Sequence, residues 1–241
     1  LDLSDSVLGI SLCDGALMAK KQFTAGDVFG VNYPDGKDFD VGTPPNLFEF
    51  TKNRTNTLAL GVGDKEGTYY VLDRRTFKVL WSRRVAQGSV VGGFQATAAF
   101  ANGVVYLAAH ESLAGTSLDT QIPDGQAAMC LGTREGLITL QSRARTREIA
   151  LEVATGNVRW QVTLPGAATF APLVIANGVL FHGDANGGLR GFDAANGTVL
   201  WQAQLGGFGY GESGVLGGNL ITALSIAEGR LLVSSVPLLG S

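Results

Sequence analysis

Cysteine and charged residues are scarce in this sequence, and each scarcity excludes a class of protein. The only two cysteines in 241 residues, Cys13 and Cys130, have no CxxC, CxxCH or Cys/His spacing, which argues against zinc binding and haem attachment. Each is expected to be a buried thiol, with one long-range disulfide as the alternative. Charged residues make up 16% of the chain and the net charge is −3, so no basic face is available for nucleic-acid phosphates. No apolar run approaches the roughly 18 residues of a membrane span.

Glycine, in contrast, is abundant, with 34 residues, about twice the usual share. Several glycines follow Asn or Thr between short apolar runs, as in Thr155-Gly156 and Asn196-Gly197. Such pairs tolerate the positive φ angles of two-residue hairpin turns. The composition therefore predicts an all-β protein rich in hairpins.

One hairpin pattern, which ends in tryptophan in three of its copies, repeats along the chain. We expect blade-end hairpins near four places: 6–23, 69–84, 148–163 and 189–204. Trp160 and Trp201 are 41 positions apart, about the length of one four-stranded antiparallel sheet in a propeller. The sequence predicts a β-propeller of four-stranded antiparallel blades, about four in number, with 1–241 forming a single propeller domain or propeller arc.

The tryptophans occupy the same place in each repeat. A residue that recurs with the blade serves packing between blades, and a buried indole contributes a large apolar surface to it. Trp81, Trp160 and Trp201 are therefore expected to be structural docking residues, with ligand stacking as the alternative.

Two insertions interrupt the period, at about 30–46 and 110–147. The first is rich in proline and Asx-Gly turns, and the second is expected to be a loop with an extra hairpin. His110 and Glu111 are expected on its surface. Arginines alternate with smaller residues near its end, which is typical of the solvent side of an edge strand, where charge discourages aggregation: Arg143, Arg145 and Arg147.

The hairpins 151–160 and 192–201 resemble the tryptophan-docking motif of pyrroloquinoline quinone (PQQ) propellers. An ordered set of motifs is similar to the C-terminal half of polyvinyl-alcohol dehydrogenase-like quinoproteins: Asp38-Phe-Asp40-Val-Gly-Thr-Pro-Pro45, Gly67-Thr-Tyr-Tyr-Val-Leu-Asp73-Arg74, Val91-Gly-Gly-Phe-Gln95 and Asn177-Gly-Val-Leu-Phe181. The resemblance spans nearly the whole chain. It implies an eight-bladed ring, of which this chain supplies about half, that holds PQQ and calcium and oxidises alcohols outside the cytoplasm.

The resemblance also assigns roles to individual residues. Alcohol oxidation needs a carboxylate to accept the hydroxyl proton, and calcium needs oxygen ligands. Asp40 is the candidate base, Asp38 and Asp40 are the candidate calcium ligands, and Gln95 and Arg74 are the candidate cofactor contacts. The alternatives are a solvated acidic turn for the two aspartates and a surface charge for the arginine.

The chain departs from that family at one motif. Gly92-Gly93-Phe94-Gln95-Ala96 lacks the family's tryptophan, and all three tryptophans of the chain are at docking positions. This favours a non-catalytic scaffold subunit without a cofactor, which binds other protein subunits or the missing half of the propeller. The alternative is an active PQQ- and calcium-dependent alcohol dehydrogenase whose C-terminal half is this chain. By the resemblance, either protein is extracytoplasmic.

Overall fold

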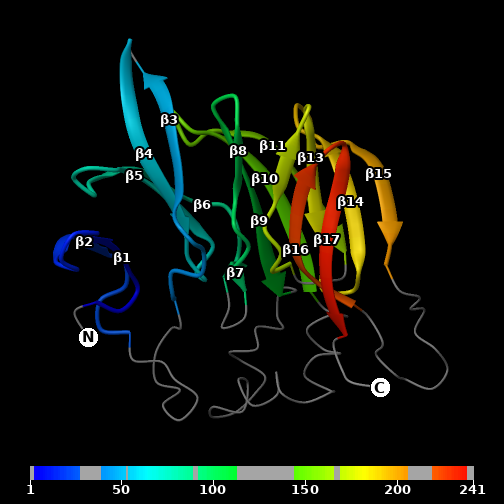
Figure 1. Cartoon of the computed structure of the whole chain (residues 1–241), viewed down its shortest axis with the longest axis horizontal. Helices are drawn as coiled ribbons and strands as arrows, with labels where there is room; N and C mark the ends of the chain where they lie inside the picture. Colours follow the sequence, from blue (N-terminus) through cyan, green and yellow to red (C-terminus); the bar gives the residue numbers. More distant parts are fainter. Residues whose placement is uncertain are drawn as a thin grey trace.

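The computed structural model describes residues 3–27, 39–52, 54–88, 92–112, 144–165, 169–205 and 219–237 (Figure 1). These residues form seventeen β-strands, and no helix occurs among them, which confirms the all-β prediction. The part of the chain that the structure describes accordingly has no helix that could cross a membrane.

Two four-stranded antiparallel sheets carry the repeat. The first consists of β3 (Asn46–Lys52), β4 (Thr55–Gly63), β5 (Thr68–Asp73) and β6 (Val79–Arg84), paired in chain order. The second consists of β12 (Val174–Ala176), β13 (Val179–Gly183), β14 (Gly188–Asp193) and β15 (Val199–Gln204), paired in the same way.

A five-stranded sheet lies between these two along the chain. It contains β7 (Gly93–Phe94), β8 (Ala99–Ala101), β9 (Val104–Ser112), β10 (Ala144–Glu152) and β11 (Val158–Pro165). The order is β11-β10-β9-β7, and β8 also pairs with β9, so two short strands share one edge position. Since β9 reaches Ser112 and β10 begins at Ala144, the predicted extra hairpin falls on 113–143, outside the described residues.

Two-stranded sheets stand at both ends of the described chain. They are β1 (Ser6–Ile10) with β2 (Leu17–Gln22), and β16 (Asn219–Ala227) with β17 (Arg230–Pro237). In Figure 1 the blue sheet lies at the left, the cyan and green sheets follow it, and the red sheet overlaps the yellow and orange one. The buried apolar side chains form four clusters, each between two consecutive sheets, so the core is divided among the sheet interfaces.

The tryptophan of one sheet docks on the hairpin turn of the next. Trp81, in β6, donates its ring N–H to the carbonyl of Val153 over 2.8 Å. The indole covers Gly156, whose φ is +73° and where a Cβ would lie 2.9 Å from the ring. Glycine is required here both for the turn and for the close approach of the ring.

Trp160 makes the same contacts one sheet later. Its ring N–H donates to the carbonyl of Ala194 over 2.9 Å, and its indole covers Gly197. Trp201, at the matching place in β15, is 45% exposed. At the other end of the described chain, nothing lies within 4 Å of the Cβ position of Gly15, in the β1–β2 turn. The last docking tryptophan and the first docking glycine are thus both uncovered.

One expectation about the cysteines is wrong. Cys13 is exposed and free, in the turn between β1 and β2, where a side chain projects from the hairpin instead of packing between sheets. Cys130 lies outside the described residues.

Candidate functional site

A salt bridge between Asp40 and Lys65 forms where the segment before β3 runs beside the end of β4. Val41 pairs with Asp64 in an isolated antiparallel bridge, and the backbone N–H of Lys65 donates to the carbonyl of Asp40 over 2.9 Å. The Lys65 Nζ atom lies 2.6 Å from Asp40 Oδ2. The side chain of Asp40 is 51% exposed and that of Lys65 is 19% exposed. An acid and a base therefore stand together, fixed by backbone pairing and reachable from solvent.

Asp64 shapes the turn that carries Lys65. Its Oδ1 accepts the N–H of Thr68 and its Oδ2 accepts the hydroxyl of Tyr70, both over 2.9 Å. Burial raises the pKa of Asp64 to about 6, because desolvation outweighs these hydrogen bonds. Burial also raises the pKa of Tyr70, and the neighbouring Asp64 carboxylate raises it further.

The same turn recurs between β13 and β14, where Asp184 takes the place of Asp64. Asp184 Oδ1 accepts the N–H of Gly188 over 2.8 Å. The residue after this aspartate is Ala185, whereas the residue after Asp64 is Lys65. A feature shared by two blades serves the blade, and a residue that departs from the repeat is a candidate for function. By this criterion Asp64 is structural, and Lys65 is a candidate functional residue.

Gln95 lies close to the segment that carries Asp40. Its Cγ is 3.6 Å from where a Cβ on Gly42 would stand, and its amide nitrogen donates to the carbonyl of Gly92 over 3.4 Å. Gln95 thus lies against Gly42, two positions along the chain from Asp40. Asp38 lies outside the described residues.

Two other aspartates, Asp5 and Asp27, lie near Asp40 or its chain neighbour. Burial raises the pKa of Asp5, and a hydrogen bond to Asp40 with the charges of Asp40 and Asp27 raises it further. Asp27 accepts the backbone N–H of Phe39 over 3.0 Å. Among the described residues no group of three or more His, Cys, Asp or Glu side chains could hold a metal ion.

Arg74 is not brought to this site. Lys65 precedes β5 and Arg74 follows it, so they lie at opposite ends of a six-residue strand, which spans about 20 Å. Arg74 is half-buried, and its N–H donates to the carbonyl of Leu58 over 3.0 Å. The three tryptophans stand on the terminal strands β6, β11 and β15 of their sheets. Trp81 and Trp160 dock on the next sheet, and Trp201 occupies the matching position.

Two further expectations are wrong. His110 and Glu111 are buried in β9, each 1% exposed, instead of lying on a surface loop. Arg145 and Arg147 stand on β10, which is paired on both sides by β9 and β11 and is not an edge strand. The physical reason is that β9 and β10 extend further into the insertion than the repeat suggests. Glu111 on β9 then forms salt bridges with Arg145 and Arg147 on β10.

Sequence reasoning missed Lys65 and Asp5. Lys65 stands in Asp64-Lys-Glu-Gly67, which reads as a charged surface turn. The available signal was the comparison of this turn with Asp184-Ala-Asn-Gly187, which has no lysine. For Asp5 the sequence holds no signal, because its approach to Asp40 depends on the packing of β1–β2 against the next sheet.

Comparison with known proteins supports this architecture. The family model PQQ_2, described as outer membrane protein assembly factor BamB, matches residues 124–225. The polyvinylalcohol dehydrogenase of Sphingopyxis sp. (strain 113P3) is 28% identical over 221 residues, which is 85% of this chain and 31% of that protein. The chain thus spans about a third of the length of this curated relative.

Solved structures share the fold. The quinohemoprotein alcohol dehydrogenase of Comamonas testosteroni superposes with a TM-score of 0.63 at 18% identity, over 95% of this chain and 38% of that one. A europium-containing methanol dehydrogenase superposes with a TM-score of 0.59 at 18% identity, over 91% of this chain and 42% of that one. The all-strand sheets and the similarity to these proteins together identify the fold as a PQQ-type β-propeller, similar to that of quinoprotein alcohol dehydrogenases.

Proposed function

We propose that this chain is part of a PQQ-dependent alcohol dehydrogenase and supplies residues beside its reaction centre. The salt bridge between Asp40 and Lys65 is the observation that carries the proposal. It joins the acidic residue expected to be the base to a lysine that departs from the blade repeat.

Asp40 would act as the general base. Oxidation of an alcohol to a carbonyl compound removes a proton from the hydroxyl group and a hydride from the carbon atom. The half-exposed Asp40 carboxylate can reach a substrate hydroxyl and accept that proton. Lys65 holds the carboxylate through Oδ2, so the orientation of the base is set before substrate arrives.

The side chains of Lys65 and Gln95 could bind the oxygen atoms at the edge of an anionic quinone. An ammonium group pairs with carboxylate or carbonyl oxygens, and an amide can donate to or accept from the same edge. PQQ, when bound, would supply the acceptor for the hydride. Calcium would need oxygen ligands beyond Asp40, and Asp38 is the candidate in this chain.

The rest of the ring would be the partner. The exposed Trp201 and the uncovered turn at Gly15 are the two halves of the docking contact seen between other sheets. They support a larger propeller in which further blades cover both ends. The similarity to quinoprotein dehydrogenases supports an extracytoplasmic location.

A non-catalytic scaffold is the second candidate. It is favoured by the tryptophan positions, because all three tryptophans stand on terminal strands of their sheets and none stands beside Asp40. In that case the Asp40–Lys65 salt bridge would only fix the segment before β3 against the next turn.

Reconstitution distinguishes the two candidates. The full-length protein is purified, PQQ and calcium are added, and unbound quinone is removed by gel filtration. The dehydrogenase is expected to retain the quinone absorbance and to reduce an artificial dye in the presence of secondary alcohols. A folded protein that retains no quinone, or retains it without oxidising any alcohol, would exclude the dehydrogenase and leave the scaffold.

A further inference from the structure

We propose that a cleft between the first four-stranded sheet and the five-stranded sheet binds a small oxyanion, a compound that carries carboxylate or phosphate groups. The cleft has a volume of about 670 Å³ and lies between β6, the segment after it, and strands β10 and β11. It shares no residue with the site of Asp40, Lys65 and Gln95, so this proposal is independent of the proposed dehydrogenase.

Arginines dominate the lining of the cleft. Arg83 and Arg84 come from β6, and Arg145 and Arg147 come from β10. Arg145 and Arg147 are two residues apart on one strand and therefore project to the same side of the sheet. Because β10 is an inner strand of its sheet, these charges do not protect a sheet edge. Their place in a cleft needs another explanation.

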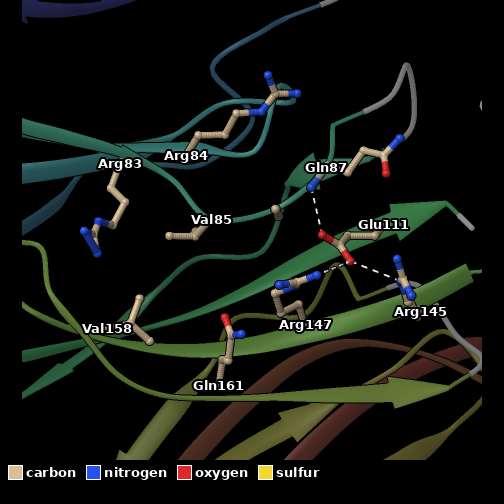
Figure 2. Close-up of a pocket in the computed structure, with 10 residues that line it drawn as sticks. Arg83, Arg84, Val85, Gln87, Glu111, Arg145, Arg147, Val158 and Gln161 are labelled. Carbon is tan, nitrogen blue, oxygen red and sulfur yellow. Dashed lines mark hydrogen bonds and ion pairs between the residues drawn. The ribbon is translucent and has the colours of Figure 1, made fainter. Parts of the chain in front are cut away.

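Glu111 organises two of the arginines. Its side chain is 2% exposed, and its Oε2 accepts hydrogen bonds from Arg145 Nε at 3.1 Å and from an Arg147 terminal nitrogen at 3.0 Å. Its Oε1 accepts the backbone N–H of Gln87 over 2.8 Å. Figure 2 shows Glu111 between Gln87 on one side and the two arginines on the other. The carboxylate thus fixes the guanidinium groups in the wall of the cleft.

The positive charge in the cleft exceeds the negative charge. Arg84 has its own partner at the rim, Glu66, at 3.2 Å. Arg83 has no ion pair within the described parts of the chain. Apart from Arg84, the lining therefore has three positive charges, those of Arg83, Arg145 and Arg147, and one negative charge, that of Glu111.

The geometry favours a second anion. Arg147 Nε is buried and has no hydrogen-bond partner among the described residues. A buried donor without a partner is costly, and guanidinium groups bind carboxylate and phosphate through paired hydrogen bonds. An oxyanion in the cleft would offset the excess charge and offer oxygen atoms to Arg83, Arg145 and Arg147.

Calorimetric titration of the full-length protein tests the proposal. Inorganic phosphate and citrate are titrated separately at constant ionic strength, set with sodium chloride. Saturable one-site binding of either probe supports an oxyanion site, and the preferred probe tells phosphate from carboxylate chemistry. Absence of saturable binding of both probes would overturn it.

Three variants locate the binding. Arg83→Gln should weaken binding about tenfold, the loss expected for one charge-assisted hydrogen bond. Arg230→Gln is the matched control, because Arg230 lies on β17 with its side chain 74% exposed, and it should bind like the wild type. Glu111→Gln removes the resident carboxylate and should tighten binding, while a purely structural Glu111 would only lower the melting temperature.

Arg83 is exposed and makes no ion pair with the described residues, so Arg83→Gln is expected to fold like the wild type. If Arg83→Gln and Arg230→Gln weaken binding equally, the anion is held by general surface charge and the site is not in this cleft.

Discussion

Lys65 Nζ and Asp40 Oδ2 lie 2.6 Å apart although the two residues are separated by 25 positions in the chain. The salt bridge is paired with a backbone hydrogen bond between the same two residues. Two contacts between one pair of residues fix both position and direction, which is the property that a catalytic base needs. The lysine is absent from the equivalent turn of the later blade.

Lys65→Gln should lower alcohol oxidation by the reconstituted protein about tenfold or more, because the orientation of Asp40 and a cationic partner are lost. The free energy of unfolding should change by less than about 1 kcal/mol, because the salt bridge is partly exposed. Steady-state rates and urea unfolding check both. Lys52→Gln on the exposed end of β3 is the matched control and should alter neither. Equal rates in the two variants would remove Lys65 from the site.

Asp64→Asn should change the pH dependence of stability. The pKa of Asp64 is raised from 3.8 to about 6 in the folded protein, so the native state binds the proton more tightly than the unfolded state. The Asp64 contribution to stability is therefore present at low pH and is lost as pH rises from about 4 to 6, by about 3 kcal/mol. In Asp64→Asn this decline should be missing, which urea unfolding between pH 4 and pH 7 measures.

Asp73→Asn provides a control of opposite sign. Hydrogen bonds from Thr76 lower the pKa of Asp73. The contribution of Asp73 to the stability of the folded protein therefore grows as pH rises and is lost in acid. A difference between wild type and Asp64→Asn that does not vary with pH would show that Asp64 is not desolvated.

Trp160→Ala should cost about 3–5 kcal/mol of stability, the usual loss for a large buried aromatic side chain. The indole is 8% exposed and its N–H donates to the carbonyl of Ala194. Trp201→Ala is the natural comparison, because the same residue type at the same repeat position is 45% exposed. It should cost far less in this chain, and chemical denaturation measures both. Equal losses would mean that Trp201 is covered in solution.

Gly197→Ala should destabilise more than Gly178→Ala. The two glycines have nearly the same φ, +78° and +77°, so the backbone strain of an alanine is matched, at about 1–2 kcal/mol. A Cβ at Gly197 would lie 2.7 Å from the Trp160 ring, whereas nothing lies within 4 Å at Gly178. The difference between the two variants measures the ring contact, and no difference would show that the indole does not rest on the turn.

The fold could be predicted because its signals are local and repeated. Thr155-Gly156 and Asn196-Gly197 specify turns from two adjacent residues, and tryptophan recurs at one place in the hairpin. The number of blades stays a prediction, since the described sheets at both ends of the chain have two strands each.

The sites could be predicted only in part, because they join residues that are distant in sequence. A resembling motif makes Asp40 a candidate, but its pairing with Lys65 depends on the register between the segment before β3 and the end of β4. Likewise, Glu111 meets Arg145 and Arg147 across more than thirty positions of chain. Alternating arginines indicate only that they share a face, and whether that face meets solvent or a buried carboxylate is decided by the packing of two sheets.

The most direct measurement compares Asp40→Asn with the wild type after reconstitution of the full-length proteins with PQQ and calcium. Quinone content is measured by absorbance and alcohol oxidation by dye reduction. If Asp40 is the general base, the variant should retain the quinone and lose at least about a hundredfold in turnover rate. Equal turnover in the two proteins, with equal quinone content, would contradict that role.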